Sequence, residues 1–284
     1  MSAVAGLERL ADWVGRTETA HDAASAAPVA MLSALLDRDD PPPRAGDALP
    51  PLAHWLHFLP VHRQSEVGAD GHARRGEFLP PVPLPRRMWA GSRIAFLRPI
   101  AIGESIRRTS TIAAVTVKEG RSGPLVFVTV RHEVSGPGGV ALTDEHDIVY
   151  RAAAGAAGAP PVAAPSGEAW SRAIRPDPVL LFRYSAATFN GHRIHYDHPY
   201  ATGVEGYPGL VVHGPLVATL LVELLRRNRA GVELESFAFR ALRPLFDTAP
   251  FTTCGLPDEP SRSARLWTRD AEGAITMEAT ATWR

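Results

Sequence analysis

Two separate parts of the chain follow the same order of elements. Each begins with a mostly apolar helix, at 29–36 and at 215–225, continues to a Leu-Arg-Pro tripeptide, at 97–99 and at 242–244, and ends in antiparallel hairpins. A shared tripeptide is weak evidence alone, but a shared order of elements is typical of an internal duplication. We therefore predict two similar units that superpose.

Alternating side chains indicate the strands of both units. In 126–134 (VFVTVRHEV) apolar residues take every second position, which is the period of a strand with one buried face. Glycine pairs at 120/123 and 136/139 predict hairpin turns, and 62–85 should form a long irregular loop. Further strands are expected at 52–59, 93–96, 104–117, 140–150, 235–242, 251–255, 262–268 and 275–283.

The two helices should lie inside the sheets. Residues 29–36 are apolar almost all round, with Pro28 in the first turn, and a helix that is apolar on every side is normally buried. The second helix, 215–225, begins at Gly214, and its Glu223 is expected at the exposed end. We expect a sheet to wrap around each helix.

A low-complexity segment of Ala, Gly, Pro and Val at 152–165 divides the chain. It predicts an N-terminal domain at 1–151, a linker at 152–168 and a C-terminal domain at 169–284. The 284 residues are 45% apolar and 21% charged, which is enough apolar surface for a packed core.

Charge and cysteine content exclude several classes of protein. The 30 basic and 30 acidic residues cancel, which argues against a nucleic-acid partner. A single cysteine, Cys254, excludes a disulfide framework or a cysteine-based metal cluster within one chain. The apolar runs are too short for a membrane span, and the N-terminus lacks a secretory signal, so a cytoplasmic protein is expected.

The densest polar cluster is YSAATFNGHRIHYDHPY at 184–200, and a His-Gly pair follows at 213–214. It offers three parts of a thioester enzyme. The imidazole of His195 titrates near neutral pH, and the amide of Asn190 can hold a water or a carbonyl. Backbone N–H groups around Gly214, at a helix N-terminus, can bind a developing oxyanion.

The cluster resembles the motif of the MaoC-like hot-dog-fold hydratases and dehydratases, Asp-x-Asn-Pro-Leu/Ile-His-x-Asp followed by a later His-Gly. Asn190 takes the position of the catalytic Asp, His195 matches the His, Asp197 the next Asp, and His213 with Gly214 the His-Gly. TFNGHRIHYD is similar to a branch that carries Asn here. That branch includes the mesaconyl-C4-CoA and itaconyl-CoA hydratases and the mitochondrial 3-hydroxyacyl-thioester dehydratases, and MWAGSR at 88–93 resembles its N-terminal domain.

The resemblance implies an α+β double hot-dog whose two halves share one active site. The implied reaction adds water across a C=C bond conjugated to a thioester carbonyl, or reverses this, without a metal or redox cofactor. His195 would move the proton, Asn190 would orient the water, and the Gly214 N–H would hold the thioester oxygen. A short dicarboxylic acyl-CoA, such as mesaconyl-CoA or itaconyl-CoA, is the implied substrate.

Other side chains are candidates for the substrate site. Guanidinium groups bind carboxylates and CoA phosphates, although a solvated arginine is the alternative. Tyr184 and Phe189 could equally belong to the core. His213 could be a packed or capping residue. The candidates are Arg93, Arg183, Tyr184, Phe189, Arg193 and His213.

Several alternatives stay open from the sequence. His192, His195, Asp197 and His198 could form a metal site, although Asp197 can instead cap the turn at 198–199. The chain could also be a 3-hydroxyacyl-CoA or acyl-carrier-protein dehydratase, a thioesterase, or a non-catalytic thioester-binding subunit. A homo-oligomer is possible.

Overall fold

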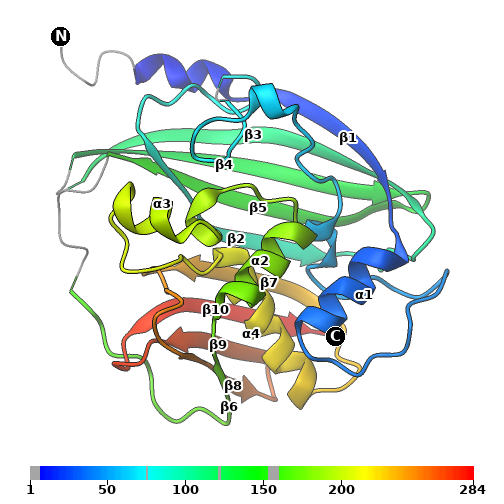
Figure 1. Cartoon of the computed structure of the whole chain (residues 1–284). Helices are drawn as coiled ribbons and strands as arrows, with labels where there is room; N and C mark the ends of the chain where they lie inside the picture. Colours follow the sequence, from blue (N-terminus) through cyan, green and yellow to red (C-terminus); the bar gives the residue numbers. More distant parts are fainter. Residues whose placement is uncertain (1–6, 75, 121–122, 153–159) are drawn as a thin grey trace.

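A single antiparallel sheet of ten strands forms the body of the structure, a computed structural model that describes residues 7–74, 76–120, 123–152 and 160–284 (Figure 1). The strand order is β1-β3-β4-β5-β2-β7-β10-β9-β8-β6. The strands are β1 (Thr17–Ala23), β2 (Arg86–Phe96), β3 (Ser105–Gly120), β4 (Gly123–Gly136), β5 (Gly139–Arg151), β6 (Trp170–Ile174), β7 (Leu234–Ala241), β8 (Phe251–Asp258), β9 (Ser263–Arg269) and β10 (Ile275–Trp283).

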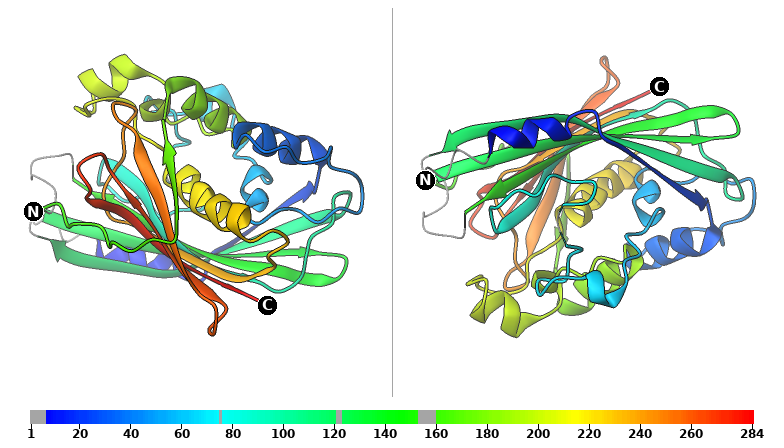
Figure 2. Two further views of the ribbon diagram at one scale, coloured as in Figure 1. Left: turned by 90° about the horizontal axis from the view of Figure 1, so that it is seen from below. Right: turned by 90° about the horizontal axis from the view of Figure 1, so that it is seen from above.

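The helices lie on one face of this sheet, which curls around them (Figure 2). The α-helices are α1 (Ala26–Leu35), α2 (Pro178–Ala187), α3 (His198–Gly203) and α4 (Gly214–Asn228). Short 3-10 helices occur at η1 (Glu8–Trp13), η2 (Ala53–Leu56), η3 (Gln64–Glu66) and η4 (Arg193–His195). No helix of the described ranges is long and apolar enough to cross a membrane.

The two halves of the sheet meet between β2 and β7 in a symmetric register. Arg93 pairs with Ala238, and two steps to either side Gly91 pairs with Arg240 and Ala95 with Ser236. Exchanging the two strands therefore leaves the pairing unchanged. The strand order is symmetric about the same point, so that β1 corresponds to β6, β3 to β8, β4 to β9 and β5 to β10.

The Leu-Arg-Pro tripeptides form the same local structure in both halves. The N–H groups of Leu97 and Arg98 both donate to the carbonyl of Ala141, at 2.8 and 3.1 Å. Those of Leu242 and Arg243 both donate to one carbonyl on β10, at 2.9 and 3.1 Å. The shared order of elements thus corresponds to a shared backbone geometry.

The helix correspondence differs from the sequence expectation. The Leu49 N–H donates to the Ile100 carbonyl just before η2, and the Val212 N–H donates to the Leu245 carbonyl just before α4. The counterpart of α4 is therefore the four-residue η2, and the counterpart of α1 is α2. Residues 52–59, expected as a strand, instead contain this 3-10 turn at Ala53–Leu56, which begins after Leu52 with a left-handed φ of 67°.

Helix α1 is not enclosed by a sheet, so that expectation is wrong. Leu32 and Leu35 are buried, but Met31 is 47% exposed. The helix packs beside α2 in an outer layer (Figure 2). Its other face carries Ala and Met side chains, which form an apolar pattern in the sequence but tolerate exposure.

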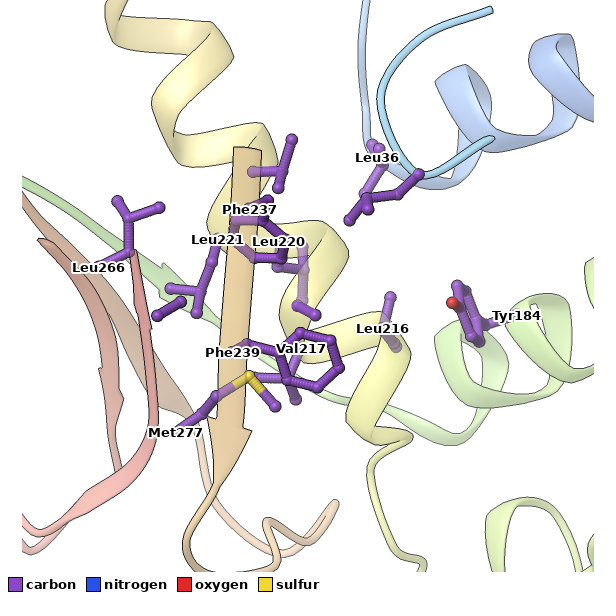
Figure 3. Close-up of a cluster of buried hydrophobic side chains, with 14 of the residues drawn as sticks. Leu36, Tyr184, Leu216, Val217, Leu220, Leu221, Phe237, Phe239, Leu266 and Met277 are labelled. Carbon is purple, nitrogen blue, oxygen red and sulfur yellow. The ribbon is translucent and has the colours of Figure 1, made fainter. Parts of the chain in front are cut away.

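Helix α4 is the central helix, as predicted. Leu220 and Leu221 are among its buried residues, and the sheet packs on it through Phe237, Phe239, Leu266 and other side chains (Figure 3). On its other side, Leu216 faces α2 (Figure 3). Burial of these apolar side chains holds the helix N-terminus at a fixed place over the sheet.

Glu223 is buried in α4 rather than exposed, which corrects the expectation. Its carboxylate is 1% exposed and receives hydrogen bonds from Arg38 at 2.9 and 3.0 Å. Arg227 lies 2.6 Å away and Arg226 3.6 Å away. Arg38 follows α1, so this ion pair ties the first half to the central helix.

Other segments follow the sequence closely. The 136/139 turn is confirmed, with Gly139 at φ 91°, and the described residues of 62–85 form a loop with one short helix, η3, and an isolated bridge between Val67 and Ala73. The 120/123 turn includes residues 121–122 and the linker includes 153–159, and these lie outside the described residues. The domain division stays a prediction.

Candidate active site

His195 is a buried imidazole with a defined proton arrangement. It lies in η4, its residue is 8% exposed, and its Nδ1 is 2.7 Å from the carbonyl oxygen of Val211. A carbonyl only accepts, so Nδ1–H donates and Nε2 carries the lone pair of the neutral ring. Burial lowers the pKa of His195 to about 4, so near pH 7 the side chain is a neutral base.

His213 stands directly behind this base. The two rings stack with centroids 3.6 Å apart, and His213 is 1% exposed. Its Nε2 lies 2.8 Å from the hydroxyl of Ser185, and it is the N-cap residue of α4. This placement makes His213 a support for the His195 ring, and its role in the substrate site stays a prediction.

Gly214 begins α4 immediately after His213. The first N–H groups of a helix have no partner within it and lie at the positive end of the helix dipole. A Cβ atom at Gly214 would lie 3.7 Å from the carbonyl oxygen of Trp89, a residue of the first half. The helix N-terminus therefore faces the junction of the two halves, and its N–H groups suit a developing oxyanion.

Asn190 is half-buried in the turn that follows α2. Its N–H donates to the carbonyl of Ser185 at 2.8 Å, and its Oδ1 accepts from the His192 N–H at 3.0 Å. Within the described ranges, no hydrogen bond uses its amide nitrogen. That group is suited to donate to a water or to a substrate oxygen.

A loop of the first half holds the Asn190 turn in place. The carbonyl of Asp70 accepts from the Arg193 N–H at 2.9 Å, and the backbone of Gly71 lies against Gly191. The His72 ring packs on the His192 ring with centroids 4.0 Å apart. Both halves therefore build this side of the site.

Asp70, His72 and His192 together could hold a metal ion. One donor atom from each lies within 4.8 Å of the others. The Asp70 carboxylate already accepts from the His72 ring at 3.0 Å and from its N–H at 3.1 Å. Burial raises the pKa of Asp70, but these hydrogen bonds outweigh burial and bring it well below its usual range. Hydrogen bonding within the cluster accounts for the arrangement without an ion.

The metal site considered from the sequence does not assemble. Asp197 caps α3 by accepting from the Tyr200 N–H at 3.1 Å, as its capping interpretation predicts, and it pairs with Arg193 at 2.8 Å. His198 is exposed at the start of α3. Among the described residues the group with metal-ligand spacing is Asp70, His72 and His192, and it includes neither Asp197, His198 nor His195.

The structure places two aromatic candidates near the site and leaves their roles as predictions. Tyr184 is buried, with its ring centroid 5.0 Å from that of His213. Phe189 is 55% exposed, at a left-handed φ of 49°, beside Asn190.

The arginine candidates take other positions. Arg193 is held by Asp197 and by the carbonyl of Ala69, so its guanidinium docks the loops together. Arg183 is exposed on α2. Arg93 binds Glu145 and Asp147 on the sheet face opposite the helices, and the structure does not bring it to the site.

Sequence reasoning expected the two halves to share one active site but missed which residues of the first half contribute. Asp70, Gly71 and His72 lie in a segment expected as an irregular loop, and Trp89 lies in a strand. The only local signal of a functional segment was a histidine with several glycines between prolines. A contact between residues more than 100 positions apart leaves no spacing pattern in one sequence.

With this geometry in place, similarity to known proteins identifies the family. Residues 52–247 match the family model of hydroxyacyl-thioester dehydratase type 2. The chain belongs to this family.

One relative and two solved structures extend the comparison. The chain is 47% identical over 270 residues to a protein of Chloroflexus aurantiacus named mesaconyl-C(4)-CoA hydratase, covering 94% of this chain and 95% of the relative. A MaoC-like dehydratase structure gives a TM-score of 0.70 at 14% identity, covering 97% of this chain and 99% of the other. A Mycobacterium tuberculosis protein described as a double hotdog gives 0.57 at 12% identity, covering 95% and 96%.

These similarities confirm the α+β double hot-dog class and the enzyme class. The chain is a hydro-lyase of the acyl-thioester hydratase and dehydratase type. In this chain the second half has a full central helix, α4, whereas the four-residue η2 takes the corresponding place in the first half.

Proposed function

We propose that the enzyme adds water across the α,β double bond of a short dicarboxylic acyl-CoA, such as mesaconyl-CoA or itaconyl-CoA, or catalyses the reverse dehydration. The observation that carries the chemistry is His195, a buried neutral base whose Nε2 lone pair is fixed by the Nδ1–H bond to Val211. The relative named mesaconyl-C(4)-CoA hydratase supports the substrate class.

In the hydration direction, Nε2 of His195 takes one proton from water while the water oxygen bonds to the β-carbon. The electron pair of the double bond shifts toward the thioester carbonyl, and the oxygen becomes an enolate. The Gly214 N–H stabilises that charge. The His195 imidazolium then returns the proton to the α-carbon, so that water has been added and the base is regenerated.

Asn190 has no proton to give up at an accessible pH, so its contribution is orientation. Its Oδ1 is held by the His192 N–H, and its amide nitrogen would donate to the attacking water. Tyr184 and Phe189 would border the acyl group. We also propose a cytoplasmic enzyme, with a homo-oligomeric assembly to be established in solution.

Hydration of mesaconyl-CoA and crotonyl-CoA, followed by ultraviolet absorbance and by a thiol reagent, tests the function. Loss of the enoyl absorbance without thiol release supports the hydratase. Thiol release would indicate a thioesterase, and no change with either substrate would indicate a binding subunit. Presenting the same acyl groups on acyl carrier protein distinguishes the two carriers.

A further inference from the structure

A row of polar side chains crosses the first half of the sheet on the face that carries the helices. The strand register places Glu18, Ser110, His132 and Asp144 side by side on β1, β3, β4 and β5. The duplicated half provides an internal comparison. The corresponding row on β6, β8, β9 and β10 is Trp170, Gly255, Leu266 and Ala279.

The neighbouring positions on the same face of the sheet show the same contrast between polar residues in the first half and apolar residues in the second half. Ser92 pairs with His146 between β2 and β5, and the corresponding pair between β7 and β10 is Phe237 and Ala281. In the second half these positions are apolar because α4 packs on them, as Phe237 and Leu266 show (Figure 3). In the first half η2 stands in place of α4, so the fold itself does not require polar residues there.

Asp144 is the centre of the polar row. It is 1% exposed and accepts from Ser92 Oγ and Trp55 Nε1 at 2.9 Å, from His146 Nε2 at 2.8 Å and from His54 Nε2 at 3.1 Å. Burial raises the pKa of Asp144, but the nearby histidines bring it well below its usual range. An ionised carboxylate only accepts, so His146 donates through Nε2 and directs Nδ1 away from Asp144.

His132 presents a second ring nitrogen in the same way. Its Nδ1 lies 2.9 Å from the hydroxyl oxygen of Ser110, which leaves Nε2 for another partner. The His132 and His146 rings lie 4.4 Å apart. In the described part of the chain no hydrogen bond uses His132 Nε2 or His146 Nδ1. His132 is half-buried and the His146 side chain is 19% exposed, so these rings keep accessible surface inside the curled sheet.

One residue connects this pair of rings to the proposed thioester site. The Trp89 ring packs on the His146 ring with centroids 4.0 Å apart. The carbonyl of the same residue lies 3.7 Å from the Cβ position of Gly214. A short acyl group whose thioester oxygen meets the α4 N-terminus would extend past Trp89 toward His146.

We propose that His146 and His132 form the subsite for the free carboxylate of a dicarboxylic acyl thioester, an inference that rests on the proposed thioester site. A carboxylate that meets His146 Nδ1 requires a proton on that nitrogen. Asp144, bonded to the opposite nitrogen, stabilises the imidazolium that results. A hydrocarbon acyl end would leave both ring nitrogens without a partner, which disfavours its binding.

Binding of two saturated thioesters tests the subsite without relying on turnover. Succinyl-CoA carries the free carboxylate, and butyryl-CoA has the same acyl chain length without it. Calorimetry would give the ratio of their Kd values for the wild type and for His146→Ala and His132→Leu, which introduce the residues of the second half. The matched control is Glu145→Ala, on the opposite face of the same strand.

The wild type should prefer succinyl-CoA, and each histidine variant should lower that preference by about 10- to 100-fold, as for loss of a charge-assisted hydrogen bond. The control variant Glu145→Ala should retain the wild-type preference for succinyl-CoA. An unchanged preference in folded variants, or no preference in the wild type, would overturn the subsite. Mesaconyl-CoA hydration by the wild type judges the proposed function separately, so failure of the subsite is distinguishable from failure of the proposed function.

Discussion

The rings of His195 and His213 lie face to face, with centroids 3.6 Å apart and 19° between their planes. His213 is fixed by its position at the start of α4 and by Ser185. The stack therefore sets the plane of the proposed base relative to the helix N-terminus, so that base and oxyanion donors share one support.

Replacing His195 by Ala should lower kcat by about 10²- to 10⁴-fold, the range for a lost general acid and base. His198→Ala is the matched control, because this histidine belongs to the same motif but is exposed and has no assigned role in the reaction. Steady-state hydration with a circular dichroism check of folding measures both. Retention of more than about a tenth of the activity by the His195 variant would contradict the assigned role.

Asn190→Ala should be severely impaired because the attacking water loses an orienting donor. Asn190→Asp should be less impaired, since it keeps the oxygen that accepts from His192. The new carboxylate should raise the pKa of His195 from about 4. The base must be neutral, so activity of Asn190→Asp should fall at a higher pH than that of the wild type as the solution is acidified. An inert wild type with an active Asp variant would instead indicate a subunit that has lost catalysis.

Gly71→Ala should disturb the active site from the first half. A Cβ atom there would lie 1.8 Å from the carbonyl oxygen of Gly191, at a φ of 89°. The turn that carries Asn190 must move, and we expect kcat to fall by at least ~10-fold. Gly46→Ala is the control, with φ 91° and no atom within 4 Å. It should cost about 1 kcal/mol of stability and leave kcat unchanged. Equal kcat values for the two variants would argue against the loop contact.

Glu223→Ala should destabilise the protein by about 3–5 kcal/mol, because the partners of a buried ion pair lose their counter-charge. Glu278→Ala, at an exposed pair with Arg240, should cost at most about 1 kcal/mol. Denaturant unfolding of both variants measures the difference. A similar loss of stability in both variants would mean that the ion pair between Arg38 and Glu223 contributes little to the free energy of unfolding.

Strands and the central helix were predictable because their information is local. The alternation at 126–134 and the apolar run at 215–225 each specify one element. Helix α1 was misplaced because an apolar composition does not show which neighbour covers a helix, and here the neighbour is α2. Glu223 was placed at the exposed end because its partner Arg38 comes from the other half.

The candidate active site was likewise predictable only where its residues belong to one motif in the sequence. The spacing of Asn190, His195 and the pair at 213–214 lies within one half and was accessible from a motif. Asp70, His72 and Asp144 also contact Arg193, His192 and His54, which lie far away in the sequence, and only the fold brings these residues together. The role of Arg93 could not be judged without knowing which face of the sheet it occupies.

The self-matching register between β2 and β7 is the kind of contact that joins identical subunits around a two-fold axis. In such an assembly every substitution occurs twice, so an Asp at the place of Asp144 would also lie at the place of Ala279, in the sheet beneath α4. Joining both copies in one chain removes that constraint. One copy can then keep the helix and the base while the other loses its helix and acquires ionisable groups. The two halves of one active site can therefore change independently within a single gene.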